Sequence, residues 1–517
     1  MSSPYLSFRI AAVGVLTLLG ACTVGPDYQR PPAVTPASFK EQDGWKPSQP
    51  RDALDRGAWW SIYQDPVLDG LVRQIDISNQ TLKQSEAAFR NAQAVVQQAR
   101  ASFSPTLSLS GSDTRSYSGG SSSSRSTSSS SSSTSTSSTT STAISSGGRY
   151  SSSYSVSTGA SWEPDLWGRI SRTVEGDVAS AQASAADLAS ARLSAQATLA
   201  TDYFELRAED ELKRLLDSTI EGYTRSRDIA RNQYNAGTAA QADVVTAQTQ
   251  LDSTRAQAVN VGVLRAQLEH AIAVLVGKAP SEFAIIPAPL TGSVPVVPTD
   301  LPSALLERRP DIAAAERRAA SANAQIGVAI AAFYPTITLS ASYGYASSAI
   351  DTLLHASNSL WSLGPSLSAT LYDGGARSAQ VAGARALYDQ DVASYRQIVL
   401  TSFQQVEDEL STLRVLEQQA GIENSVVQSA QEAERLTLNQ YRAGTVPYSS
   451  VITAQATTLS NRQTALTVRQ NRLVASVALV QALGGGWDAS QLPPADRMDI
   501  VDTPVAADTV QPVRSTP

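Results

Sequence analysis

The stretch FSPTLSL at residues 103–109 returns as FYPTITL at residues 333–339, and this repeated block decides the fold. A predicted helix ends before each Phe-x-Pro. After each proline, apolar residues alternate with Ser or Thr, which is typical of a β-strand with one apolar face. Each copy therefore predicts a helix that runs into a strand.

Further blocks repeat in the same order. NQYNAGT at residues 232–238 returns as NQYRAGT at residues 439–445, and the VVTAQ that follows the first returns as VITAQ after the second. Internal similarity of this kind marks a duplicated unit. We predict repeat 1 over residues 69–279, a Pro- and Val-rich linker over 280–301, and repeat 2 over 302–486. The fold class is mostly α, each repeat having the order helix, strand, strand, long helix, helix.

The residue pattern of the predicted strands is typical of strands that span a membrane. They cover about residues 105–111, 150–162, 335–345 and 362–372, with a Ser-rich external loop at 112–149. Hydroxyl residues on one face and apolar residues on the other are typical of a transmembrane β-barrel, although a soluble sandwich also alternates. Four strands cannot close a barrel, and open edges in lipid leave backbone groups unpaired. Closure therefore requires an oligomer, and three chains would supply twelve strands.

The predicted helices are long. Residues 170–234 and 375–441 are nearly free of Pro and Gly. At 1.5 Å per residue, each helix would reach about 100 Å. Their shorter partners are predicted at 241–276 and 448–483, the second with a coiled-coil seam of one apolar residue in seven. Helices of this length suit a rod or a tube.

The N-terminal residues have the features of a secretory targeting signal. Residues 1–21 form a signal peptide, whose apolar run is shorter than the roughly 20 residues that span a bilayer. Its end, LGAC at residues 19–22, resembles the lipobox of bacterial lipoproteins, in which the cysteine is acylated. Cys22 is the only cysteine, and Thr23 after it implies the outer membrane. We expect a lipidated segment at 22–68 and a disordered tail at 487–517.

Composition excludes several classes of function. The net charge is −7 and no basic stripe occurs, so a nucleic-acid partner is not expected. One cysteine allows no intrachain disulfide, and His270 and His355 lack further ligands nearby in sequence. No nucleophile–base pair, phosphate loop or metal spacing emerges. We predict no enzyme activity, no metal and no cofactor.

Several motifs carry a family resemblance: CTVGPDY at 22–28, WEPDLWGR at 162–169 and LLERRPDI at 305–312, with Trp59-Trp60 and DPVL at 65–68. Together they resemble the TolC-like outer-membrane efflux channels, in their NodT-type lipoprotein branch. The resemblance implies a homotrimer with a twelve-stranded β-barrel in the outer membrane, continued by a periplasmic α-helical barrel. It also implies docking to a periplasmic adaptor (membrane fusion protein) and an inner-membrane pump of the resistance–nodulation–division (RND) type.

The resemblance places the periplasmic entrance at two helical turns. The candidate tip and gate residues are Gly237, Thr238, Asp243, Tyr441, Gly444, Thr445, Ser449 and Thr453. Related channels commonly carry Asp and Leu where this chain has Thr453 and Ser449, so it departs from an acidic constriction. Asp243 matches an acidic position, and it also fits a helix-start cap.

Other charged residues allow both a structural and a functional interpretation. We expect Asp311, which follows Pro310, to cap or complement the start of a helix rather than to bind substrate. The acidic runs at 209–211 and 407–409 fit solvated helix faces, with a tunnel lining as the alternative.

The sequence thus predicts an outer-membrane channel that exports small toxic compounds and draws its energy from an inner-membrane partner. Two alternatives stay open. One is the channel of a type I protein secretion system. The other, of a different class, is a trimeric coiled-coil spacer of the cell envelope.

The lipobox gives a direct test. Replacing Cys22 by Ser removes the only thiol that can be acylated, so we expect the variant to incorporate no labelled palmitate in cells. Wild-type protein in the same culture is the control. Labelling of Cys22→Ser at the wild-type level would show that the anchor is assigned to the wrong residue.

Overall fold

The computed structural model describes residues 23–33, 36, 39–41, 58–118, 149–290, 294–295 and 305–498. Two compact units emerge. The sheet unit comprises Met1–Pro26, Gln98–Val174 and Ile326–Ala382, and the helical unit comprises Asp27–Gln97, Glu175–Gln325 and Gly383–Pro517. Cys22 and most of the predicted Ser-rich loop lie outside the described residues.

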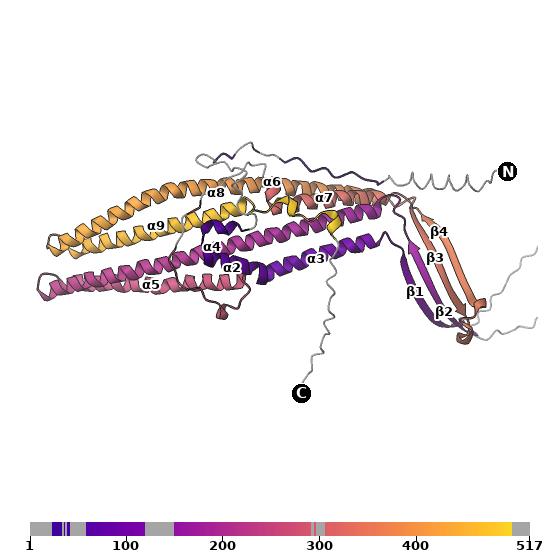
Figure 1. Ribbon diagram of the computed structural model, residues 1–517, viewed down its shortest axis with the longest axis horizontal. Coiled ribbons are helices and arrows are strands. Elements are labelled where there is room, and N and C mark those ends of the chain that lie inside the picture. The colour runs from indigo at the N-terminus through magenta and orange to yellow at the C-terminus, as the bar shows by residue number, and fades with distance from the viewer. Residues whose placement is uncertain are drawn as a thin grey trace, which may run out of the picture. The chain divides into compact units, whose positions relative to one another are not determined.

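The sheet unit contains one antiparallel sheet whose four strands lie in chain order (Figure 1). The strands are β1 (Thr106–Ser118), β2 (Arg149–Trp162), β3 (Thr336–Ser347) and β4 (Ser359–Ser368). The two repeats each contribute a hairpin, and β2 pairs with β3 between them, with Ala160 opposite Ala341. Hydroxyls on one face contact each other across the strands, as Ser110 and Ser157 do at 2.9 Å.

Two strands, β1 and β4, differ from their predicted bounds by more than two residues at one end or both. β1 continues to Ser118 because Ser116 Oγ lies 2.7 Å from Ser151 Oγ and the Tyr117 ring lies 4.8 Å from that of Tyr150. The sequence there is too rich in Ser to signal a strand. β4 ends at Ser368, before the predicted residue 372, because its partner strand begins at Thr336, opposite Ser368.

Equivalent helices of the two repeats have equal lengths, which confirms the duplication. The 22-residue pair is α3 (Gln80–Ala101) and α7 (Pro310–Ala331). The 67-residue pair is α4 (Arg169–Asn235) and α8 (Ala376–Arg442). The 35-residue pair is α5 (Gln241–Leu275) and α9 (Tyr448–Ala482), and Figure 1 shows these forming helical hairpins with α4 and α8. In the described part of the chain, no helix is both long enough and apolar enough to cross a membrane.

The first predicted helix of each repeat is interrupted. In repeat 1, α2 (Pro66–Ser78) ends at Asn79, whose Oδ1 accepts from the Leu82 N–H at 3.0 Å while its Nδ2 donates to the Leu275 carbonyl at 2.7 Å. In repeat 2, α6 (Leu305–Arg308) stops because Pro310 disfavours helical backbone at the residue before it. Predicting one continuous helix at each place was therefore wrong.

The core of the helical unit joins both repeats to short N-terminal elements. The N-terminal elements are η1 (Trp59–Tyr63) and α2. The other short helices of the helical unit are η2 (Pro280–Glu282), η6 (Ala489–Gln491) and η7 (Ala495–Arg497), whereas η4 (Ile350–Thr352) and η5 (Ala356–Asn358) belong to the sheet unit. Trp59 and Leu68 are buried in one cluster with Tyr203 of repeat 1 and Leu479 of repeat 2. The Trp59-Trp60 motif is therefore a packing element of this core.

A buried ionic cluster fixes the linker between the repeats. Asp210 pairs with Arg265 at 2.7 Å and with Arg207 at 3.1 Å, and it accepts from the Ala288 N–H at 3.0 Å. Glu269 accepts from the Ile285 N–H at 2.5 Å. The expectation of a solvated face at residues 209–211 is wrong for Asp210, because linker backbone and two arginines cover its carboxylate.

The first part of the predicted disordered tail is ordered. Trp487 and Leu492 pack against Ala186, Ala313 and Ala314, and Met498 is buried. Small alanines on two helices leave room for these large side chains, which the sequence alone did not reveal. The remainder, residues 499–517, lies outside the described range.

The Arg-Arg-Pro-Asp motif at residues 308–311 caps the C-terminal end of α9. Arg309 donates to the carbonyl of Ala482, the last residue of α9, at 2.9 Å, and its other nitrogens pair with Asp311 at 2.6 and 3.0 Å. Asp311 lies in the first turn of α7, where its charge complements the helix dipole. Gly484 follows with φ +94°, and a Cβ there would meet the Arg308 carbonyl oxygen at 2.1 Å.

This contact predicts that Gly484→Ala destabilises the protein by at least about 2 kcal/mol, since a Cβ brings both backbone strain and a clash. Thermal unfolding of the purified protein, followed by circular dichroism, measures the effect. Gly222→Ala is the control, because a Cβ at this position in α4 meets nothing within 4 Å, and alanine favours helix. Equal melting temperatures for the two variants would contradict the assigned packing.

Candidate functional site at the helical tips

The two helical hairpins end in turns of the same geometry. Gly237 has φ +73° and Gly444 has φ +74°, the left-handed conformation that glycine adopts without strain. In the first turn, the Thr238 N–H donates to the Gln233 carbonyl at 2.9 Å, and in the second the Thr445 N–H donates to the Gln440 carbonyl at 3.0 Å. These bonds satisfy carbonyls at the helix ends, so the Gly-Thr pairs shape the turns.

An apolar cluster joins the two tips. Ala230 and Ala247 of repeat 1 pack with Tyr441, Tyr448 and Val451 of repeat 2. The rings of Tyr441 and Tyr448 lie 5.0 Å apart, and both side chains are buried. The Tyr441 hydroxyl has no hydrogen-bond partner in the described part of the chain, although it is enclosed. An unpaired buried hydroxyl costs about 1–3 kcal/mol, which lowers the net stabilisation that this packing provides.

Asp243 is close enough to the two tyrosines to act on their ionisation. Burial, and then the charge of Asp243, raises the pKa of Tyr441. Burial, with smaller contributions from Tyr441 and Asp243, raises the pKa of Tyr448 to about 12. A raised tyrosine pKa means that the packing is at full strength below the ordinary value of 10.0 and weakens as the pH rises toward 12. At neutral pH both phenols are uncharged and the cluster stays apolar.

A buried hydrogen bond also crosses between the hairpins. Gln455 on α9 donates from Nε2 to the Ser226 hydroxyl on α4 at 2.8 Å. Its counterpart in repeat 1, Gln248, instead donates to Asp252 on its own helix at 2.8 Å, and this pair is exposed. The duplication thus placed equivalent glutamines in two roles, and of the two only Gln455 ties the hairpins together.

One face of α9 near the tip is uncharged. Ser449, Thr453 and Thr457 follow each other at intervals of four residues, and the Thr453 hydroxyl donates to the Ser449 carbonyl at 3.0 Å. All three have exposed or half-exposed hydroxyl side chains, and α9 contains no Asp or Glu. This face presents hydroxyl oxygens to solvent and carries no acidic residue.

The predicted tip residues divide into three groups. Tyr441 and Asp243 come together, Ser449 and Thr453 lie exposed on α9, and the glycines and threonines form the turns. Asp243 is not a side-chain cap: Ala240 occupies that position, and Asp243 lies within the first turn of α5. Sequence reasoning missed Tyr448 and the Ser226–Gln455 pair, although a tyrosine opening an otherwise polar helix start was a possible signal.

Similarity to known proteins extends over both repeats. The outer membrane efflux protein family matches residues 71–278 and 301–485, which cover both repeats. The chain belongs to this family.

Relatives and solved structures of this family extend over nearly the whole chain. The probable efflux pump outer membrane protein TtgC of Pseudomonas putida is 29% identical over 514 residues, which are 98% of this chain and 100% of that protein. The solved outer-membrane channel OprN is 28% identical, with a TM-score of 0.80 over 90% of this chain and 100% of its own. The open state of the Neisseria gonorrhoeae channel MtrE is 26% identical, with a TM-score of 0.76 over 90% of this chain and 99% of its own.

The family assignment fixes the class of function. Outer membrane efflux proteins are channels rather than enzymes, and this chain is an outer-membrane efflux channel. Its fold is theirs, with the same tandem repeats.

The cross-hairpin bond predicts an asymmetry between equivalent glutamines. Gln455→Leu leaves the Ser226 hydroxyl buried without a partner, which costs about 1–3 kcal/mol of tip packing. We expect faster hydrogen–deuterium exchange over residues 220–230 and 448–460. Gln248→Leu, the matched change in repeat 1, removes only an exposed pair and should leave exchange unchanged. Equal protection in both variants would show that the bond does not hold the tips.

Proposed function

We propose that three copies of this chain form a duct across the outer membrane and the periplasm. In this duct, compounds delivered by an inner-membrane pump leave the cell. The observation that carries the proposal is the family match over both repeats, together with the likeness to OprN along nine-tenths of the chain. Because the chain is an outer-membrane channel, its sheet face, its unpaired strand edges and the packing of its tips can each be given a role in the duct.

The sheet presents a face suited to lipid. Leu107, Leu109, Trp361, Leu363 and Leu367 project from one side, and each is more than 65% exposed. The opposite side carries the paired serine hydroxyls. An apolar face of this extent would favour association or aggregation in water, whereas in a bilayer it is the favourable outer surface. We infer that the hydroxyl face lines an aqueous lumen.

The edges of the sheet support closure by copies of the chain. β1 and β4 each pair on one side only in the described residues. Because four antiparallel strands place β1 and β4 in opposite directions, β4 of one copy fits antiparallel beside β1 of the next. Closed barrels usually need at least about eight strands, and three copies supply twelve.

The start of the described chain supports the lipid anchor. The Val24 N–H donates to the Trp167 carbonyl at 3.1 Å, and Arg172 donates to the Val24 carbonyl at 3.2 Å. Gly168, with φ +75°, leaves room for Thr23. Thr23 is thus held beside Trp167 and Gly168, a few residues after β2 ends at Trp162. We propose that an acyl chain on Cys22 enters the leaflet next to this end of the sheet.

The tips are the proposed gate. Tyr441 and Tyr448 of the second hairpin pack against Ala230 and Ala247 of the first. This packing and the Ser226–Gln455 bond hold the two hairpins of one chain together, and separating them would widen the entrance. We propose that a periplasmic adaptor and an RND-type pump supply the binding energy for this separation. A type I protein secretion partner is the second candidate for the same duct.

Conductance tests the proposal. Purified protein in planar bilayers should show small channels, and Tyr441→Ala together with Tyr448→Ala should increase the conductance several-fold by loosening the closed tip. Tyr234→Ala is the matched control, because Tyr234 is the repeat 1 equivalent of Tyr441 and is 43% exposed. A passive envelope spacer would give no conductance in any variant, which would overturn the proposed duct.

A further inference from the structure

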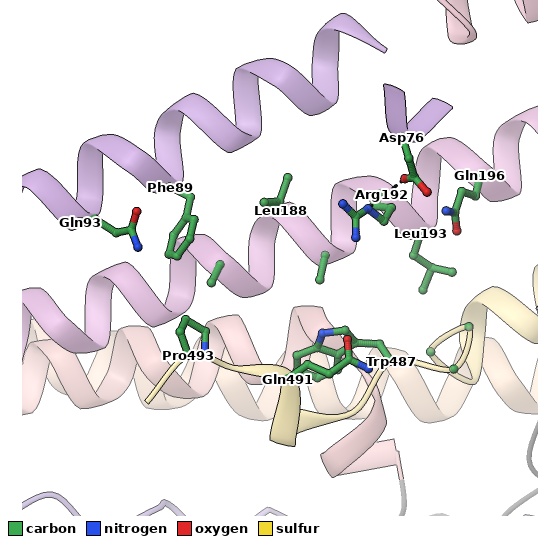
Figure 2. A pocket seen from close by; sticks show the side chains of 15 residues that line it. Asp76, Phe89, Gln93, Leu188, Arg192, Leu193, Gln196, Trp487, Gln491 and Pro493 are labelled. Atoms are coloured by element: carbon green, nitrogen blue, oxygen red, sulfur yellow. Dashed lines mark ion pairs between the residues drawn. The ribbon is translucent and has the colours of Figure 1, made fainter. Parts of the chain in front are cut away.

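A cavity of about 450 Å³ in the helical unit has no part in the duct or the gate. It lies between α3, α4 and the segment that follows α9, with Asp76 of α2 at its rim. Figure 2 shows Phe89 and Pro493 toward one end, with Asp76, Arg192 and Gln196 toward the other. Leu188, Leu193 and Trp487 complete the apolar wall. Gln93 lies beside Phe89 at the first end, which is otherwise apolar, whereas the second end holds the Asp76–Arg192 pair and Gln196.

Gln196 presents an unused donor at the polar end. The residue is only 5% exposed, and its Oε1 accepts from the indole Nε1 of Trp59 at 3.2 Å. Because an indole nitrogen can only donate, this contact fixes the amide orientation and turns Nε2 the other way. In the described structure no atom accepts from Nε2, and the nitrogen is not sealed off, because Gln196 borders the cavity.

Arg192 adds a charged donor one helical turn away. Its Nε pairs with Asp76 at 3.0 Å, while its two terminal nitrogens have no acceptor in the part of the chain that the structure describes. Residues four apart lie on the same helix face, so Arg192 and Gln196 present their donors side by side. The terminal nitrogens of a guanidinium match the two oxygens of a carboxylate, even when Nε is already paired.

We propose that this cavity binds a small amphipathic carboxylate, with its carboxylate on Arg192 and Gln196 and its apolar body against Phe89, Leu188 and Trp487. The volume is within the range of sites for small organic ligands. A ligand there would contact α3, α4 and the segment after α9 together. Binding should therefore raise the thermal stability of the helical unit.

The test uses the full-length protein in lipid nanodiscs, which avoids detergent micelles that would absorb the probe. Isothermal titration with 4-phenylbutyrate should show one saturable site per chain after subtraction of empty nanodiscs. The neutral isostere 4-phenylbutanamide should bind at least about tenfold more weakly, since a charge-assisted hydrogen bond is lost. This comparison needs no variant and is independent of any folding defect.

Two variants locate the site. Arg192→Gln removes the charge, and Gln196→Glu keeps the acceptor for Trp59 while placing a like charge against the ligand. Each should weaken 4-phenylbutyrate binding at least about tenfold. Arg73→Gln is the control, because Arg73 pairs with Asp69 on α2 and does not line the cavity.

Three results would overturn the assignment. They are equal binding of the carboxylate and the amide, unchanged binding in Arg192→Gln, and no saturable heat with the wild-type protein. The last is expected if side chains of a neighbouring copy fill the cavity in the assembled channel.

Discussion

Backbone pairing at the sheet edges constrains the rest of the molecule. β1 and β4 each have one side without a strand partner in the described chain, and the sheet carries a broad exposed apolar face. An unpaired N–H or C=O in hydrocarbon costs several kcal/mol, and a strand has many of them. In lipid, the chain is therefore stable only when its edges meet those of other copies. The proposed assembly follows from this requirement.

The two repeats have helices of equal length and turns of the same geometry, but their side chains make different contacts at the tips. Equivalent helices have equal lengths, and the two turns use the same Gly-Thr geometry. Yet Tyr441 is buried where Tyr234 is exposed, and Gln455 crosses to the other hairpin where Gln248 stays on its own helix. Identical hairpins would offer identical contacts to the adaptor and to each other. A few side chains have diverged, so that repeat 2 contributes the tyrosines and Gln455 of the tip packing while repeat 1 contributes the charge of Asp243.

Periodic features of the fold could be predicted from the sequence. The repeat, the four strands and the three helix pairs all leave regular patterns in residue type. The interruptions could not, because they depend on tertiary partners: Asn79 ends a helix by bonding to Leu275, and β1 extends through serines that signal no strand by themselves. The same holds for Asp210, whose partners Arg265 and Ala288 lie far away in sequence. At the tips, the turn residues could be predicted. The contacts of Tyr448 and Ser226 could not, because they depend on how the two hairpins pack together.

The mass of the purified particle tests the central claim most directly. Light scattering coupled to size exclusion, corrected for bound detergent, gives the number of chains in each particle. The account predicts three chains, with the sheet edges of each covered by its neighbours. A stable, folded particle of one chain would show that β1 and β4 need no partner, and the proposed duct would then be untenable.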